Sequence, residues 1–322
     1  APQFQLINHG QVKQSELEAI RARLSHKGYQ PDHWPLFDYE LSYYQNQFIL
    51  HISIDGLICD GVSSSILFTE LSQLYNAQHN EEVILPKLQI SYRDYIVKMN
   101  QIRSSDLFDQ AKAYWKNKLH NYQFDAKLPM IRKPNTIDKP RFNRVTKTIK
   151  RSLWNAIKNK ANQCHISPTS VIIYVYGLIL SKWSSNSQFC INLTLYNRLP
   201  LHEQTNQIVG DFTALELFNF IRQNNGSIQS HICSIHSQLW DDIEHNLFDG
   251  IDFQRLIRNE LNITPSQSLS PVVLTSILNE NHNTTNLEGC IGEGYSITQT
   301  TQVYLDNKAY LTDEGFVAEW DY

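Results

Sequence analysis

Hydrophobic residues recur along the chain with two different periods, and these periods predict helices and strands in alternation. Apolar positions at helical spacing predict helices over 14–26, 63–76, 92–119, 152–162 and 219–239. Strand-like runs, several of them with apolar and polar residues in alternation, predict a hairpin from 37–44 and 47–54, and strands over 144–149, 189–196, 271–278, 303–310 and 316–320. No repeat period accompanies these elements, so the pattern predicts an α/β or α+β fold.

The most apolar stretch is Val171–Leu180, and it predicts a buried helix. It is about half as long as a segment that crosses a bilayer. Ser167 is suited to cap this helix, and Pro168 fits the first helical position. We therefore expect a core helix that runs from Pro168 to Trp183.

The length of 322 residues is enough for two domains or for one unit of two lobes. Prolines at 129, 134 and 140 lie among charged residues, which favours a crossing linker over 127–144. We therefore expect an N-terminal lobe over 1–126 and a C-terminal lobe over 145–322.

Composition and charge exclude several classes of function. Lysine and arginine number 28 against 32 acidic residues, and this balance offers no basic surface for nucleic acid or for an anionic membrane. The five cysteines are odd in number, widely spaced and without a C-x-x-C pair, so neither a disulfide framework nor a zinc site is indicated. No secretory segment is apparent, and we expect a reducing, cytoplasmic environment. His231 and His236 are interpreted as ordinary surface or core residues.

Motifs for nucleotide binding, zinc proteolysis and serine hydrolysis are absent from the sequence. The informative stretch is Leu50–Tyr75, which places Asp55 at a strand end, Asp60 in a turn and Ser63 at the start of a helix. Taken alone, this Asp-x4-Asp-x2-Ser pattern is typical of a capped turn, in which a carboxylate accepts backbone N–H groups or pairs with an arginine.

This stretch resembles the condensation superfamily of nonribosomal peptide synthetases, which shares the chloramphenicol-acetyltransferase fold. Asp60 and Gly61 match the end of the family motif, while its two histidine positions fall on Asp55 and Gly56. The change to Asp-x4-Asp-x2-Ser is the hallmark of the heterocyclization branch. His51 offers a rival alignment with Asp55 and Gly56, but the following helix continues only from Asp60.

Further motifs occur in the order that the family shows. The resemblance covers five more segments: Ser167–Ser184, Ile191–His202, Val209–Leu217, Ser270–Leu278 and Ile297–Tyr310. Leu274 replaces a phenylalanine of the family pattern and Thr301 replaces a proline. Six ordered motifs over most of the chain make the resemblance specific.

The resemblance implies a two-lobed, V-shaped pseudo-dimer that here lacks its N-terminal and C-terminal ends. It implies substrates delivered on the phosphopantetheine arms of upstream and downstream peptidyl carrier proteins, with an adjacent adenylation domain. No cofactor or metal bound directly by the chain, no nucleic acid and no membrane are expected.

The reaction implied has two stages: amide formation with carrier-bound Cys, Ser or Thr, and then cyclodehydration to a thiazoline or oxazoline. Asp306 is the leading candidate for the general acid/base of ring closure, and Thr275 matches the family's hydroxyl partner, which orients either this carboxylate or the substrate carbonyl. Partial burial in a strand would raise the pKa of Asp306 toward neutrality. Asn192 and Ser276 match further polar positions, although inter-strand hydrogen bonds would explain them equally well.

The remaining motif residues are expected to have supporting roles. By family analogy Asp60 pairs with Arg198 and braces the loop. Asp55 has either a role toward the substrate or a structural role. Asp211 and Thr213 are interpreted as structural, and Gln302 belongs to the motif that contains Asp306.

Two other functions stay open at this point. An ordinary condensation domain would form the amide without dehydration, and a silent domain would only bind carrier proteins. The sequence does not specify the nucleophile, the acyl donor or the product, for which a siderophore or a peptide antibiotic are candidates.

Overall fold

A computed structural model describes residues 5–77, 83–132, 136–137, 141–263, 269–278, 296–300 and 302–322. These residues divide into two compact units. Unit 1 holds the described residues up to Tyr92 together with 198–212 and 296–299, and unit 2 holds the others.

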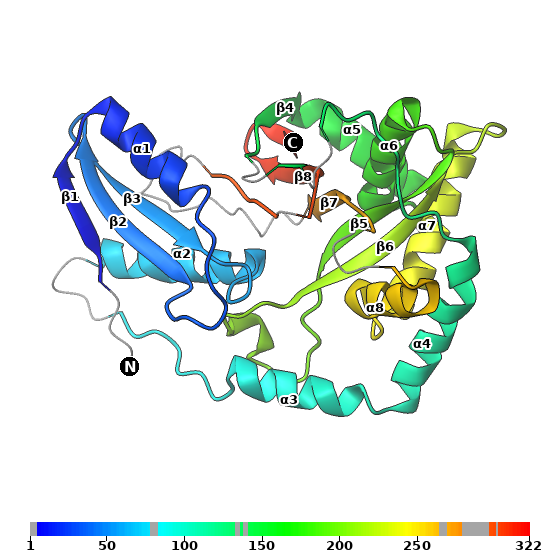
Figure 1. The fold of residues 1–322 in the computed structure, drawn as a ribbon, viewed down its shortest axis with the longest axis horizontal. Helices are drawn as coiled ribbons and strands as arrows, with labels where there is room; N and C mark the ends of the chain where they lie inside the picture. Colours follow the sequence, from blue (N-terminus) through cyan, green and yellow to red (C-terminus); the bar gives the residue numbers. More distant parts are fainter. Residues whose placement is uncertain are drawn as a thin grey trace. The chain divides into compact units, whose positions relative to one another are not determined.

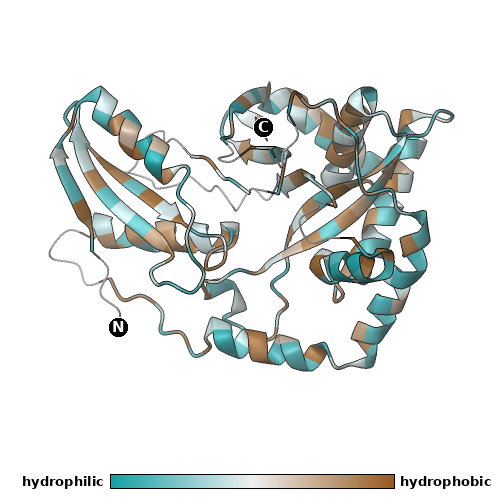
Figure 2. Ribbon diagram, in the orientation of Figure 1, coloured by the Kyte–Doolittle hydropathy of each residue, from teal (hydrophilic) through white to brown (hydrophobic). Residues whose placement is uncertain are grey.

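Unit 1 contains a three-stranded sheet and two helices (Figure 1). Its elements are β1 (Ile7–Gln11), α1 (Gln14–Leu24), β2 (Phe37–Tyr44), β3 (Gln47–Ile54), α2 (Gly61–Asn76) and the short 3₁₀ helix η3 (Thr205–Gln207). Strand β2 is central, parallel to β1 and antiparallel to β3. Alternating hydropathy is visible as bands of colour along β2 and β3 (Figure 2).

Helix α1 packs on the sheet face that carries Glu40. Its apolar residues Leu17, Ile20 and Leu24 are buried, as the helical spacing predicts. Arg23 of the same helix donates to Oε2 of Glu40 at 2.5 Å. A carboxylate that is 1% exposed is tolerated here because it is paired and hydrogen-bonded.

Unit 2 is built on a six-stranded mixed sheet with the order β4-β9-β8-β7-β5-β6. Its strands are β4 (Arg144–Lys150), β5 (Gln188–Tyr196), β6 (Thr213–Ile221), β7 (Val272–Ile277), β8 (Leu305–Thr312) and β9 (Gly315–Asp321). Its helices are α3 (Tyr92–Ile102), α4 (Asp106–Lys118), η1 (Leu119–Asn121), α5 (Arg151–Gln163), α6 (Pro168–Trp183), α7 (Ile228–Glu244) and α8 (Gly250–Leu261). Strand β7 is parallel to both neighbours, β5 and β8.

The two faces of this sheet differ in chemistry. Side chains alternate along a strand, so residues paired across strands share a face. The register places Ile191, Leu193, Leu274, Ala309 and Phe316 on one side, which we call the apolar face. The opposite side, the polar face, carries the set Asn192, Thr194, Thr275, Asp306 and Lys308.

Helices α5, α6 and α7 pack against the apolar face (Figure 1). Trp154 of α5 stacks on Phe316 with ring centroids 4.5 Å apart. Gly177 lets α6 approach β6, because a Cβ atom there would lie 2.3 Å from the ring of Phe220. Within the described residues no single helix is long and apolar enough to span a bilayer. The consecutive helices α5 and α6 reach that length and apolarity only when taken together, and they are bent by 108° relative to each other.

Helices α4 and α8 cover the other side of the sheet near β5 and β6 (Figure 1). Trp115 of α4 is 1% exposed and packs against Phe253 of α8, with ring centroids 4.9 Å apart. This packing joins α4 to unit 2, whereas the sequence predicts it in an N-terminal lobe over 1–126. The boundary predicted at 127–144 therefore does not separate the two compact units, and residues 198–212 also cross it into unit 1.

Most of the predicted elements are present, and the mixed α/β class is confirmed. The hairpin of β2 and β3 has the predicted bounds, and Ser167 caps α6 by accepting the N–H of Ser170. The helix predicted over 92–119 is two helices, since Ser105 begins a second one as its N-cap. The helix predicted over 219–239 is wrong at its start, because residues 219–221 end strand β6 and Ser227 caps α7. Helix α8 and strand β1 were not predicted.

Candidate functional site

The turn before α2 holds a buried ion pair within unit 1. Asp60 is the N-cap of this helix, and its Oδ1 accepts the N–H of Ser63 at 2.6 Å. Arg198 donates to the same Oδ1 and to Oγ of Ser63, both at 2.9 Å. The side chains of Arg198 and Asp60 are 5% and 0% exposed. The predicted pairing of Asp60 with Arg198 is present.

Arg198 also fastens the segment that follows β5. Its Nη1 donates to the carbonyl oxygens of Thr205 at 3.1 Å and Ile208 at 2.8 Å. The guanidinium lies 3.9 Å from the ring centroid of Phe212, a distance at which cation–π attraction is effective. Because a planar guanidinium serves several acceptors at fixed angles, this residue links the α2 turn to residues 205–212.

Ser63 completes this link. It is fully buried, and its hydroxyl donates to the carbonyl of Gly210 and accepts the N–H of the same residue, at 2.8 and 3.0 Å. All hydrogen-bonding capacity of the Ser63 hydroxyl is thus used inside the fold. The geometry is that of a structural brace, with no free atom of Ser63 for a substrate.

The other motif residues of this region lie nearby. Asp55 is half-buried, and its Oδ1 accepts the N–H of Leu57 at 2.9 Å, which closes a short turn. Asp211 is half-buried and directly precedes Phe212, whose N–H donates to Asp60 Oδ2 at 3.3 Å. Thr213 is half-buried at the start of β6, in unit 2.

The candidate catalytic residues Asn192, Thr275 and Asp306 share the polar face of the sheet in unit 2. Val273 pairs with Asn192 of β5 on one side and with Asp306 of β8 on the other. Thr275 lies two residues further along β7 and therefore points to the same face. Three side chains that are up to 114 residues apart in the sequence are thus brought onto neighbouring strands by parallel pairing.

Ser276, by contrast, is not part of this set. It pairs with Ala309, so it lies on the apolar face, opposite to Thr275. Its hydroxyl is buried and finds no hydrogen-bond partner in the part of the chain that the structure describes. The resemblance placed it with the catalytic residues, but the alternation of the strand separates it from them.

The Thr275 hydroxyl has a partner that the sequence did not indicate. It donates to Oγ1 of Thr194 at 2.9 Å, and Thr194 pairs with it across the strands. Asp306 is thus not the observed partner of this hydroxyl among the described residues. Asn192 is 7% exposed, and its Oδ1 has no hydrogen-bond partner there either.

Asp306 has the electrostatic properties expected of a proton-transfer group. Burial raises the pKa of its carboxyl, and the charge of Lys308 opposes this shift. Its Oδ1 is buried and accepts no hydrogen bond from a described residue. An unpaired oxygen on a carboxyl of raised pKa is suited to exchange a proton with a bound molecule. Gln302, three residues before β8, is exposed.

A network of charged residues beside Asp306 was missed by the sequence analysis. Lys308 Nζ lies 3.0 Å from Asp321 Oδ2, and Arg144 holds the same carboxylate through two bonds of 2.6 Å. Arg144 also lies 3.2 Å from Oε2 of Glu319. Charged residues occupy every second position at Asp306 and Lys308 of β8 and at Glu319 and Asp321 of β9, and this spacing is the one signal in the sequence that could have indicated the network.

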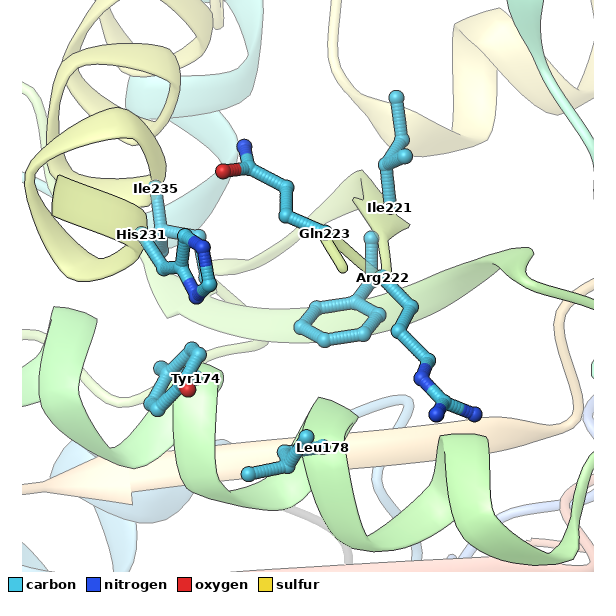
Figure 3. Close-up of a pocket in the computed structure, with 8 residues that line it drawn as sticks. Tyr174, Leu178, Ile221, Arg222, Gln223, His231 and Ile235 are labelled. Atoms are coloured by element: carbon cyan, nitrogen blue, oxygen red, sulfur yellow. The ribbon is translucent and has the colours of Figure 1, made fainter. Parts of the chain in front are cut away.

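A small pocket of unit 2 lies on the other side of the sheet (Figure 3). It is bordered by Tyr174 and Leu178 of α6, by His231 and Ile235 of α7, and by the end of β6 at Phe220. Phe220 pairs with Phe189 and so belongs to the apolar face. The pocket is therefore separate from the polar face that carries Asp306.

The family model of the condensation domain matches residues 2–311. Bacitracin synthase 1 of Bacillus licheniformis is 33% identical over 310 residues, which make up 94% of this chain and 6% of that protein. Pyochelin synthetase PchF of Pseudomonas aeruginosa is 30% identical over 318 residues, or 96% of this chain and 17% of that protein. The chain thus spans a small part of these curated relatives.

Among solved structures, the cyclization-docking bidomain of the nonribosomal peptide synthetase EpoB from Sorangium cellulosum is similar in fold. The TM-score is 0.85 at 29% identity, and the match covers 98% of this chain and 64% of that chain. The strands and motifs described above therefore lie within a known architecture. Because the family model matches nearly the whole sequence, this chain belongs to the condensation-domain family.

Proposed function

We propose that this chain catalyses heterocyclization in a nonribosomal peptide synthetase: it joins a carrier-bound acyl donor to a carrier-bound Cys, Ser or Thr and then closes a thiazoline or oxazoline ring. The observation that carries the proposal is the buried carboxyl oxygen of Asp306, which has no hydrogen-bond partner among the described residues and lies on the same sheet face as Asn192 and Thr275. The similar solved structure from Sorangium cellulosum supports it, since that structure is a cyclization-docking bidomain.

In the first stage the acceptor's amino group attacks the donor thioester. A C–N bond forms, the C–S bond to the donor's phosphopantetheine arm breaks, and the thiol leaves with a proton. Both substrates come on arms of carrier proteins, so we propose upstream and downstream carriers as partners and an adenylation domain as a neighbour. Gly56 stands where ordinary members of the family have their second histidine, so this stage does not use a histidine there.

In the second stage the side-chain thiol or hydroxyl adds to the new amide carbonyl. Asp306, as a carboxylate, accepts the proton of the attacking group. It delivers this proton to the former carbonyl oxygen, then takes up the proton of the nitrogen and passes it to the same oxygen, which leaves as water as the C=N bond forms. A single carboxyl with one unpaired oxygen can carry out these transfers in turn. Thr275 donates to Thr194, and we propose that the Thr194 hydroxyl so positioned donates in turn to the substrate's carbonyl oxygen.

The test uses the full-length protein that contains this chain, with a loaded donor carrier and acceptors loaded with Cys, Ser or Thr. Mass spectrometry of the acceptor-bound product distinguishes the outcomes. A product one water lighter than the linear amide supports heterocyclization and identifies the nucleophile. A linear amide alone indicates ordinary condensation, and no product with any acceptor indicates a carrier-binding domain without activity.

Asp306→Asn tests the assigned role. We expect amide formation at the normal rate and ring closure slowed by about 100-fold or more, the usual contribution of general acid–base catalysis. Asp313→Asn is the matched control, because this carboxyl lies in the turn between β8 and β9 and its side chain is 92% exposed. Equal loss of both stages in Asp306→Asn would contradict the assignment.

A further inference from the structure

A compact cluster of five ionisable side chains lies around Asp306 on the polar face. It consists of Asp306, Lys308, Glu319, Asp321 and Arg144, contributed by the adjacent strands β8, β9 and β4. Three of these groups are acids and two are permanently basic near neutral pH. The cluster is therefore balanced in charge only when one of the three acids holds a proton.

Two of the acids, Asp321 and Glu319, are closely paired with other side chains. Burial alone would raise the pKa of Asp321, but the hydrogen bonds from Arg144 and the charge of Lys308 lower it below its usual value. Glu319 has Arg144 at 3.2 Å, and the Tyr310 hydroxyl donates to its other oxygen at 2.9 Å. Asp306 has no such support, since Lys308 Nζ stands 4.0 Å from its Oδ2. Asp306 is therefore the acid of the cluster with the weakest pairing.

We propose that Lys308 is a positioning residue for Asp306, whose ammonium group sets the protonation of this carboxyl for ring closure. The inference rests on the proposed function. The ammonium is fixed by its 3.0 Å contact with Asp321, which Arg144 in turn anchors. From this position its Nζ lies 4.0 Å from Oδ2 of Asp306, where its charge favours the carboxylate that accepts the proton of the attacking group.

The other groups that face Asp306 agree with this arrangement. Burial raises the pKa of Asp306, Lys308 and Arg144 lower it, and Asp321 and Glu319 raise it. On the far side of the sheet, Tyr176 of α6 interacts with the charge of Asp306, but burial raises the pKa of this phenol and keeps it neutral. Lys308 is the largest of the opposing charges, so its removal shifts the proton equilibrium of Asp306 toward the acid form.

The alternative is that Lys308 only pairs with Asp321 to hold β8 and β9 together. In that case its loss would lower stability and slow both stages together, with no change in the pH dependence of either one. If Lys308 instead acts through Asp306, its loss changes the pH profile of ring closure and leaves that of amide formation unchanged. The pH profile therefore separates the two explanations.

The experiment measures both stages in single turnovers of the full-length protein across a range of pH. For Lys308→Met we expect the rising limb of the ring-closure profile to move to higher pH. At a pH on that limb, the ring-closure rate should fall by about tenfold, the effect of one opposite charge at this range. Lys308→Arg should restore the profile, and amide formation should be unchanged throughout.

Two further variants complete the design. Lys308→Gln keeps an N–H donor for Asp321 without the charge, so it serves if the methionine variant does not fold, and it should show the same shift. Lys147→Met is the matched control on exposed β4 and should leave the profile unmoved. A folded Lys308→Gln or Lys308→Met with the wild-type profile would overturn the inference.

The same data separate this inference from the proposed function. If Asp306→Asn closes the ring at the wild-type rate, the role of Asp306 is refuted and the inference falls with it. If Asp306→Asn abolishes ring closure while the Lys308 variants keep the wild-type pH profile, the proposed function stands and only the role of Lys308 is refuted.

Discussion

Replacement of Arg198 by methionine tests whether the α2 turn depends on its buried ion pair. The substitution keeps most of the side-chain volume and removes the charge and every hydrogen bond. Among the described residues, the fully buried carboxylate of Asp60 would then keep only the N–H groups of Ser63 and Phe212 as donors. The carbonyls of Thr205 and Ile208 would also lose their donor.

The magnitude follows from the burial of both partners. Removing one member of a buried pair costs about 3–5 kcal/mol, because the other charge stays desolvated and unpaired. An exposed pair contributes only about 0.2–1 kcal/mol. Arg255→Met is the matched control: Arg255 lies 3.2 Å from Asp252, but its side chain is 69% exposed. Asp252 also keeps Arg103 at 3.0 Å in that variant.

Hydrogen exchange followed by mass spectrometry measures the effect locally. In Arg198→Met we expect the opening free energy of the α2 amides to fall by about 3 kcal/mol or more. The amides of α6, which belong to unit 2, should keep their protection in the same sample. If the α2 amides change by less than about 1 kcal/mol, the pair has the energetics of a surface contact and the reasoning is wrong.

Two further predictions concern unit 2. Gly177→Ala should destabilise the protein in urea by about 1–3 kcal/mol, since the overlap of the new Cβ with Phe220 exceeds the gain in helix propensity of about 1 kcal/mol; Gly28→Ala, with no atom within 4 Å, is the neutral control. Glu216 is fully buried, and burial first and the charge of Asp242 second raise its pKa well above the usual value. Its acid form stabilises the fold below the unfolded-state pKa, and this stability is lost as the pH rises toward the folded-state pKa. Glu216→Gln should therefore lose less unfolding free energy than the wild type as the pH rises above the ordinary glutamate pKa of about 4.3, and a parallel decline in both proteins would refute this.

Much of the fold follows from local patterns in the sequence. The alternation over 37–54 predicted the hairpin with the correct bounds, because one face of β2 and β3 is more buried than the other. Ser167 and Pro168 predicted the start of α6, since a cap and the first helical position have distinct chemical requirements. Asp60 is likewise a cap that its spacing to Ser63 indicates.

Strand β6 shows where local patterns fail. It is buried on both faces, with Leu217 packed toward α8 and Phe218 toward α6, so its apolar residues are nearly continuous. Such a run has no period of two and cannot be distinguished from a buried helix by spacing alone. The helix predicted from residue 219 therefore began inside a strand. Gly226, with φ of 108°, and the Ser227 cap mark the true start of α7.

The candidate site is harder to predict than the fold because it depends on strand register. A shift of one residue would turn every side chain of a strand to the opposite face. The register of β5, β7 and β8 is held by Leu193, Leu274 and Ala309, which are at most 4% exposed on the apolar face. Sequence motifs identify the polar residues, but this packing determines which of them lie side by side on one face of the sheet. It brings Asn192 of β5 and Thr275 of β7 onto the face of Asp306, which their separate motifs do not indicate, whereas alternation within one strand is enough to put Lys308 on that face and Ser276 on the other.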